Sequence, residues 1–173
     1  MKIIKRLSVI AISIICLCLS VSAQKTAPTD VLLTVGGKVE HPLSLTRADL
    51  EKFTRQTMKI KSRDGKEHKY EGVSVGDILL KVGVEFGEAL HQEAAATYLL
   101  AEATDGYRVV FALPEFDSPS IDRLILLVDR IDGSPIPAAT GPLQLIVPAD
   151  KGRGRWVRQL KSLTLVLAPS TSR

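Results

Sequence analysis

The sequence lacks cysteine everywhere except in an apolar run near its N-terminus. Among its 173 residues, Cys16 and Cys18 are the only cysteines. From residue 24 onward the chain therefore has no disulfide, no thiolate metal ligand and no cysteine nucleophile. The three histidines, His41, His68 and His91, are far apart and show no ligand spacing. Surface or turn positions are favoured for them over a metal site.

Other signatures that would indicate a common chemistry are also missing. The sequence contains no GxGxxG dinucleotide motif, no phosphate-binding loop and no HExxH zinc motif. The formal net charge is +4, and Lys2, Lys5 and Arg6 at the N-terminus supply three of the cations. Without them the chain is close to neutral, so its overall charge gives no support for a nucleic-acid-binding face.

The N-terminal segment has the three parts of a cleavable signal peptide. The three cations precede an apolar run, Leu7–Leu19, and the small residues of Val21-Ser22-Ala23 suit cleavage before Gln24. A membrane anchor is the alternative, but the run is shorter than the roughly 18 residues that a spanning helix needs. A lipoprotein is disfavoured, because both cysteines follow bulky aliphatic residues where lipid modification requires a small one.

These features predict that the protein is exported and divided into four parts. Export would end in the periplasm of a bacterium with two membranes and otherwise in the medium, with no transmembrane segment after cleavage. Residues 1–23 are the signal peptide and 24–30 a polar linker. Residues 31–168 form one domain of ordinary size, and 169–173 form a tail.

Pairs of turn residues between strand-like runs predict three β-hairpins. They are Gly36-Gly37 between Val31–Val35 and Lys38–Glu40, Asp64-Gly65 between Gln56–Lys61 and Lys66–Glu71, and Asp105-Gly106 between Thr97–Thr104 and Tyr107–Leu113. Three apolar runs predict further strands: Leu124–Asp129, which Asp132-Gly133 ends, Leu143–Val147 and Leu160–Leu167.

Two short helices are predicted from capping patterns. Thr46 and Asp49 have the spacing of a capping box, and Ser74 and Asp77 repeat it before an apolar helical run. Gly83 then suits the C-terminal end of the second helix. The sequence therefore predicts an α+β domain that is rich in β-strands, with small helices inserted between them.

The order of these segments resembles the molybdopterin-binding domain of the sulfite oxidase family. The matching stretches are Leu33–Gly37 with Val39, Pro42–Thr46 with Asp49-Leu50, Tyr70–Val73 with Asp77–Leu80, Asp105–Tyr107 with Phe111 and Leu113, Asp132-Gly133, Gly141-Pro142, Val147-Pro148 and Arg155–Val157. Together they span residues 31–167. The resemblance implies a mixed α+β fold of the sulfite oxidase type.

The resemblance also implies a molybdenum cofactor, but one residue that it needs is absent. In the family, a pterin dithiolene and one protein cysteine hold the metal, which carries oxygen-atom or electron transfer. That cysteine would fall between Glu51 and Glu71, where this sequence has Thr57 and Ser62 but no cysteine. Hydroxyl groups are poor, hard ligands beside a soft thiolate. Molybdopterin is therefore implied by resemblance alone, and the family's metal chemistry does not carry over.

The strongest candidate site is the basic, glycine-rich segment 151–158. Lys151, Arg153 and Arg155 are interleaved with glycines, which lets backbone N–H groups and guanidinium groups approach a phosphate or carboxylate. In the family the corresponding loop lies near the pterin. A solvated basic loop is the alternative. We expect Arg158 on a strand surface and Trp156 as an anchor in the core.

Two further candidates come from turns. Asp105 and Tyr107 flank a favoured hairpin glycine, and the resemblance places their segment near the cofactor. A plain hairpin turn is the alternative reading. Glu115 and Asp117 form a carboxylate pair, but nothing near them in the sequence suggests a substrate, so a solvated loop is expected there.

Three functions fit these observations. The favoured one is a non-catalytic binding module for a pterin-like or other anionic molecule, or one that docks to a redox or membrane partner. The first alternative is a molybdopterin-dependent oxidoreductase with an atypical, cysteine-free metal site. The second is a structural protein with an empty pocket. The chain is short for a molybdoenzyme, which usually adds segments around its large cofactor, and this favours the binding module.

Overall fold

The computed structural model describes residues 30–62, 65–89, 95–117 and 124–170. The predicted signal peptide, most of the linker, Asp64, His91 and the end of the tail lie outside this range. Among the described residues, none of the helices combines the length and the hydrophobicity of a membrane-spanning segment.

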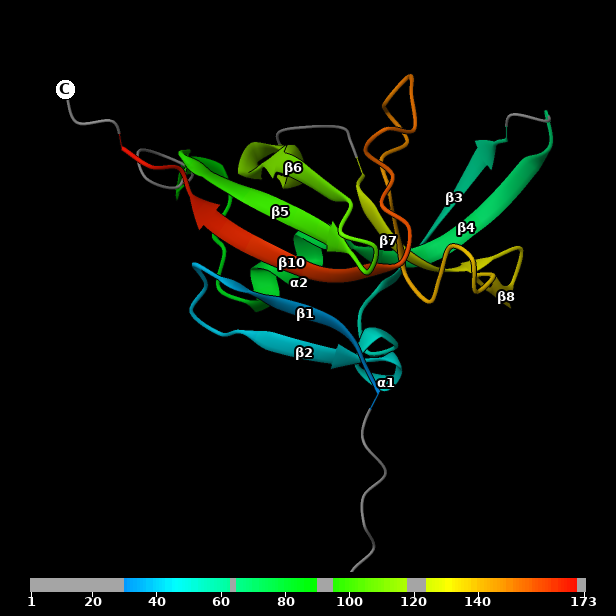
Figure 1. The fold of residues 1–173 in the computed structure, drawn as a ribbon, viewed down its shortest axis with the longest axis horizontal. Helices are drawn as coiled ribbons and strands as arrows, with labels where there is room; N and C mark the ends of the chain where they lie inside the picture. The colour runs from blue at the N-terminus through cyan, green and yellow to red at the C-terminus, as the bar shows by residue number, and fades with distance from the viewer. Residues whose placement is uncertain (1–29, 63–64, 90–94, 118–123, 171–173) are drawn as a thin grey trace, which may run out of the picture.

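The first sheet has five strands in the order β2-β1-β10-β5-β6 (Figure 1). Its strands are β1 (Val31–Gly37), β2 (Leu43–Thr46), β5 (Thr97–Ala103), β6 (Arg108–Ala112) and β10 (Leu160–Leu167). β1 and β10 run parallel, whereas the other neighbours are antiparallel. The sheet is therefore mixed, and it joins the first and last strands of the domain.

The second sheet contains the order β3-β4-β7-β8, and β9 pairs with β7 as well. Its strands are β3 (Arg55–Lys61), β4 (Glu67–Ser74), β7 (Leu126–Ile131), β8 (Ser134–Pro135) and β9 (Gln144–Ile146). Gly72 is required at the register shift where β4 pairs with β7, because a Cβ there would lie 2.0 Å from the Leu127 carbonyl oxygen. β3 and β4 extend beyond this point as a long pair of strands (Figure 1).

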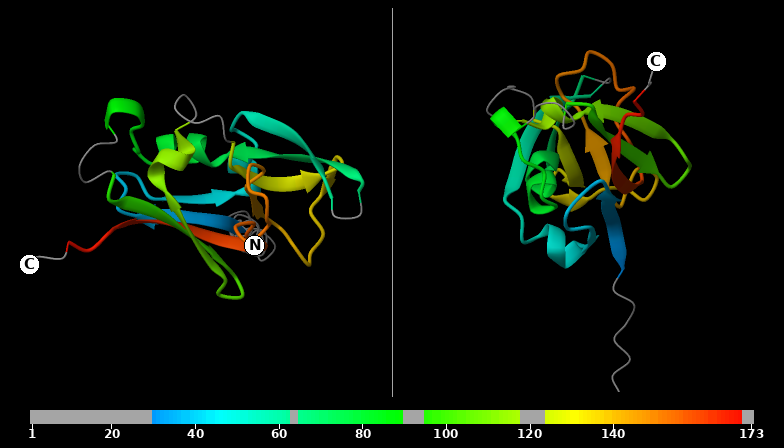
Figure 2. Two further views of the ribbon diagram at one scale, coloured as in Figure 1. Left: turned by 90° about the horizontal axis from the view of Figure 1, so that it is seen from above. Right: turned by 90° about the vertical axis from the view of Figure 1, so that its left-hand side faces the viewer.

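The helices are short, and α2 packs against one face of the first sheet (Figure 2). They are α1 (Arg47–Leu50), α2 (Val75–Lys81) and two single 3₁₀ turns, η2 (Gly87–Ala89) and η3 (Leu113–Phe116). Ile78 and Leu79 of α2 are fully buried in the main core, which also takes the inward side chains of both sheets. A second, smaller cluster forms around Tyr70, Ile136 and Ile146 on the other face of the second sheet.

Most predicted strands are confirmed, together with the hairpin turn at Asp105-Gly106. At Asp132-Gly133 both residues have positive φ, 52° and 78°, as a tight turn between β7 and β8 requires. The strands Gln56–Lys61 and Lys66–Glu71 pair as expected, with Met58 opposite Tyr70. The predicted β-rich α+β fold class is therefore confirmed.

Two local predictions are wrong. The Gly36-Gly37 pair does not form a two-residue hairpin turn, because β1 continues through Gly37 and the returning strand begins at Leu43. Backbone N–H groups of the intervening segment bind Leu165 and Val82 instead, so distant strand and helix ends direct the chain there. The second predicted cap also fails, since the Ser74 side chain makes no capping bond, whereas the Thr46–Asp49 capping box is present.

Candidate functional site

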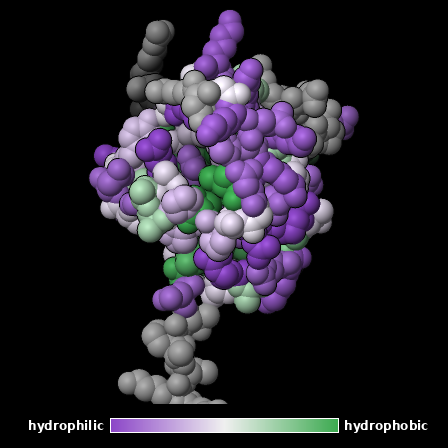
Figure 3. Space-filling view, turned by 90° about the vertical axis from the view of Figure 1, so that its right-hand side faces the viewer, coloured by the Kyte–Doolittle hydropathy of each residue, from purple (hydrophilic) through white to green (hydrophobic). Residues whose placement is uncertain are grey.

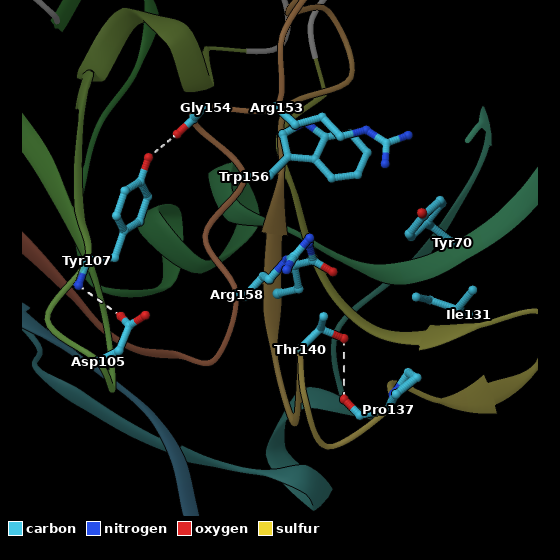
Figure 4. Close-up of a pocket in the computed structure, with 11 residues that line it drawn as sticks. Tyr70, Asp105, Tyr107, Ile131, Pro137, Thr140, Arg153, Gly154, Trp156 and Arg158 are labelled. Atoms are coloured by element: carbon cyan, nitrogen blue, oxygen red, sulfur yellow. Dashed lines mark hydrogen bonds between the residues drawn. The ribbon is translucent and has the colours of Figure 1, made fainter. Parts of the chain in front are cut away.

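An open pocket of about 590 Å³ lies where several parts of the chain meet (Figure 4). The β5–β6 turn contributes Asp105 and Tyr107, and the loop 151–158 contributes Arg153 and Trp156. β4 and β7 supply Tyr70 and Ile131, and the segment before β9 supplies Thr140. At the end of the molecule that carries β3, β4 and β8, the surface has a hollow with a hydrophobic floor and a hydrophilic rim (Figure 3).

Trp156 anchors one wall of this pocket. Its indole N–H donates to the Val147 carbonyl at 3.1 Å, and its ring meets the Tyr70 ring edge-on at 5.9 Å. The side chain packs against both hydrophobic clusters. The predicted role as a core anchor is confirmed, and the same ring also lines the pocket.

Arg153 lies over the Trp156 ring, with its guanidinium carbon 4.6 Å from the ring centre. One of its N–H groups donates to the Lys61 backbone carbonyl at 3.3 Å. No carboxylate of the described residues forms an ion pair with it. A cation–π contact of this kind fixes the direction of the side chain without neutralising its charge.

Tyr107 ties the β5–β6 turn to the basic loop. Its hydroxyl donates to the Gly154 carbonyl, and its backbone N–H donates to the Asp105 carboxylate at 2.9 Å (Figure 4). Tyr107 as a residue remains 48% exposed. The structure thus brings together Asp105, Tyr107 and Arg153, three of the five residues that the sequence singled out.

Arg155 points the other way and lies outside the pocket lining. Its guanidinium makes two bonds of 2.7 Å to Asp150 and one of 2.6 Å to Glu115. These hydrogen bonds, first to Asp150 and then to Glu115, raise the pKa of Arg155 above its ordinary value. Lys151 is exposed and also lies outside the lining, whereas Arg158, expected on a strand surface, lines the pocket.

The carboxylates of Glu115 and Asp117 do not form the solvated loop that we expected. Glu115 lies in η3, where it binds Arg155 and accepts the Ala112 N–H at 3.0 Å. Asp117 is buried, and it accepts the Gly87 N–H at 3.1 Å. Sequence position alone did not show that these acids would meet partners from distant elements.

Ser74 occupies the centre of a GxSxG pattern, Gly72–Gly76, at the junction of β4 and α2. Such a junction can hold a nucleophilic serine, which then needs a nearby base and a strained backbone. Here Ser74 has ordinary dihedral angles, φ −59° and ψ 130°, and no histidine lines the neighbouring pocket. Among the described residues, the serine therefore has no histidine base beside it.

The part of the chain that the structure describes contains no group of three or more His, Cys, Asp or Glu residues placed to hold a metal. His41 is exposed, and His68 Nδ1 lies 2.7 Å from the Asp132 carboxylate. That hydrogen bond, followed by one from the Lys69 N–H, lowers the pKa of Asp132.

Several lining residues have no signal in the sequence that marks them. Tyr70 and Ile131 follow the alternating pattern of any half-buried strand, and Thr140 stands in a proline-rich connection. Gln144 lies within an apolar run and reads as part of a buried strand. These residues join the site only because β4, β7 and β9 pair in one sheet.

The comparisons with known proteins agree with this fold. The sulfane dehydrogenase SoxCD from Paracoccus pantotrophus superposes with a TM-score of 0.61 at 21% identity, covering 80% of this chain and 39% of that chain. At this identity the likeness shows the fold, and the chain spans about two fifths of the SoxCD chain. None of the curated proteins matches the sequence.

The sequence model of the oxidoreductase molybdopterin binding domain matches residues 20–173, nearly the whole chain. This match and the shared fold confirm the resemblance to the sulfite oxidase family. The chain belongs to the oxidoreductase molybdopterin binding domain family.

Proposed function

We propose that this domain is a non-catalytic binding module that holds an anionic, ring-bearing small molecule of the pterin kind in the pocket beside Trp156. The observation that carries the proposal is Arg153, a cation stacked at 4.6 Å on an anchored indole and lining an open pocket. A side chain held in this way is oriented before a ligand arrives, which lowers the entropy lost on binding.

The chemistry of the lining supports an anion with a flat ring. Arg153 and Arg158 supply guanidinium groups, which bind carboxylates and phosphates with paired hydrogen bonds. Tyr70, Tyr107 and Trp156 supply aromatic surface against which a ring can pack. The volume of about 590 Å³ lies within the usual range of small-molecule pockets.

Molybdopterin, the cofactor after which the family is named, fits this chain only in part. The cofactor supplies redox chemistry at molybdenum when it is bound. Its pterin and phosphate suit Trp156, Arg153 and Arg158, but the metal would find no protein thiolate, because no cysteine follows Cys18. The lining offers only hard oxygen and nitrogen donors, such as the Asp105 carboxylate and the Thr140 hydroxyl, which are poor partners for a soft site. We therefore derive no redox step for this domain.

The binding proposal has a built-in reporter, since Trp156 is the only tryptophan in the chain. A titration of the purified exported protein with pterin-6-carboxylate should change the indole fluorescence and saturate, and calorimetry should give the same affinity. Arg153→Ala should weaken binding about tenfold, because one charge-assisted contact and one stacked cation are lost. Lys151→Ala, an exposed cation of the same loop, is the matched control and should bind as the wild type does.

Two results would overturn the proposal. Equal affinity of Arg153→Ala and wild type would place the ligand elsewhere. Stoichiometric molybdenum in protein from a host that makes the cofactor would favour the cysteine-free oxidoreductase, the alternative function.

Export through the signal peptide is part of the same proposal. Residues 1–23 have the required charge, apolar run and cleavage site. N-terminal sequencing of the protein from the periplasmic fraction should begin at Gln24. An intact N-terminus in the cytoplasmic fraction would contradict export.

A further inference from the structure

A glutamine stands where the fold would accept an apolar side chain. Gln144 is in β9, between Leu143 and Leu145, both fully buried in the main core. Because side chains alternate along a strand, Gln144 faces the opposite side of the sheet, where Ile146 joins the second cluster. Gln144 is itself 6% exposed. A polar amide is therefore placed on a hydrophobic face.

The amide of Gln144 has no hydrogen-bond partner among the described residues, although other buried polar groups have one. Asp129 binds Arg55, and Asp117 accepts the Gly87 N–H. The Gln144 side chain lines the pocket instead. Its amide atoms are therefore open to the pocket and are not fully enclosed by protein. Burying an amide without a hydrogen bond costs stability, so a group kept in this state has its partner in whatever fills the pocket.

We propose that Gln144 is the specificity-determining residue of the pocket and that its amide forms hydrogen bonds with the polar edge of the ligand's ring. A primary amide presents one acceptor and two donors side by side. It pairs with a ring that carries an adjacent donor and acceptor, such as a lactam or an amidine, and it leaves a hydrocarbon ring unpaired. This inference rests on the proposed function, because it concerns the same pocket.

Each pocket residue then recognises a different feature of one molecule. Arg153 binds the negative charge, Trp156 packs against the ring, and Gln144 selects the polar edge. A site that must hydrogen-bond a ligand rejects an analogue without those groups strongly, since the buried amide stays unpaired in that complex. Charge and stacking alone would accept any aromatic carboxylate.

The experiment compares two probes of similar outline and charge on two proteins. Pterin-6-carboxylate has a lactam and amidine edge, whereas 2-naphthoate has the same bicyclic shape and carboxylate without one. Gln144→Met keeps the length of the side chain and removes its hydrogen bonds. We expect Gln144→Met to bind pterin-6-carboxylate about tenfold more weakly than wild type and to bind 2-naphthoate with unchanged affinity.

Thermal unfolding of the free proteins separates recognition from a structural role. A Tm of Gln144→Met equal to or above that of wild type is expected, because an unpaired buried amide has been removed. A lower Tm, or an equal change in affinity for both probes, would overturn the inference and leave the proposed function intact. A wild-type protein that binds neither probe would overturn the proposed function and this inference with it.

Discussion

Arg153 and Arg155 are separated by one glycine, yet the fold uses them in opposite ways. Arg155 is fixed by the carboxylates of Asp150 and Glu115 and contacts the Phe111 ring at 5.1 Å. Arg153 rests on Trp156 and meets no carboxylate of the described residues. A run of cations in a sequence therefore contains both structural and binding charges, and the partners of each charge distinguish the two kinds.

The difference has a direct consequence for the loop. The bonds of Arg155 connect the loop to η3 through Glu115 and close it upon itself through Asp150. Arg153 can then point into the pocket because its neighbour holds the backbone. We expect tied arginines, those bound to carboxylates as Arg155 is, to affect stability. We expect the stacked arginine, Arg153 on Trp156, to affect ligand affinity.

The largest effect should come from a third arginine, which binds the most buried carboxylate of the described residues. Arg55 of β3 binds Asp129 of β7 through two N–H groups, and Asp129 is 2% exposed. Arg55→Ala would leave that charge buried without a partner, at a cost of about 3–5 kcal/mol in the free energy of unfolding. Urea denaturation measures this loss.

The double variant Arg55→Met with Asp129→Leu is the control for that result. Replacing both charges by apolar groups removes the unpaired carboxylate, so it should recover much of the loss. A double variant as unstable as Arg55→Ala would show that the arginine stabilises by packing and would break the distinction between tied and stacked cations.

The second prediction sets the two loop arginines directly against each other. Arg155→Ala removes a charged partner from each of two partly buried carboxylates and should cost about 2 kcal/mol, or roughly 4–8 °C in Tm. Arg153→Ala should change stability by less than about 0.5 kcal/mol. Differential scanning calorimetry of both variants measures the contrast, and similar losses would contradict it. Arg155→Lys should recover only part of the loss, since a single ammonium cannot make the paired bonds to Asp150 and the bond to Glu115 together.

Local patterns predicted most of the fold. The Asp105-Gly106 turn, the alternation of β3 and the capping box at Thr46 each depend on neighbouring residues alone, and the structure has all three. The Gly36-Gly37 turn failed because its geometry depends on Leu165, a residue far along the chain, whose carbonyl would lie 2.2 Å from a Cβ on Gly37. Local signals cannot report such a contact.

The site was predictable only where a family resemblance supplied the long-range information. Asp105, Tyr107 and Arg153 were singled out, and the structure brings them to one pocket. The opposite orientations of Arg153 and Arg155 did not follow from the sequence, because the acids that fix Arg155 are chosen by the packing of η3. Gln144 was missed for the same reason, since a lone polar residue in an apolar run gives no local indication of what it faces.

A smaller effect should come from the half-exposed ion pair between His68 and Asp132. Asp132 is 53% exposed on its side chain, and its turn position has a φ of 52°, which asparagine tolerates. The variant Asp132→Asn therefore keeps the backbone and removes the charge that His68 Nδ1 binds at 2.7 Å. At neutral pH we expect a slightly lower Tm than in wild type.

The pH dependence of that difference tests its electrostatic origin. Hydrogen bonds from His68 and from the Lys69 N–H lower the pKa of Asp132 in the folded protein. The stabilisation is therefore fully present above the unfolded value of about 3.9 and disappears as pH falls through the lowered folded value. The Tm gap between wild type and Asp132→Asn should close below about pH 4. Glu67→Gln, which removes an exposed charge next to His68 in β4, should show little gap at neutral pH. A Tm difference for Asp132→Asn that persists in acid would mean that side-chain packing rather than charge stabilises this turn. The exposed His68–Asp132 pair would then differ in kind from the ion pairs of Arg55 and Arg155.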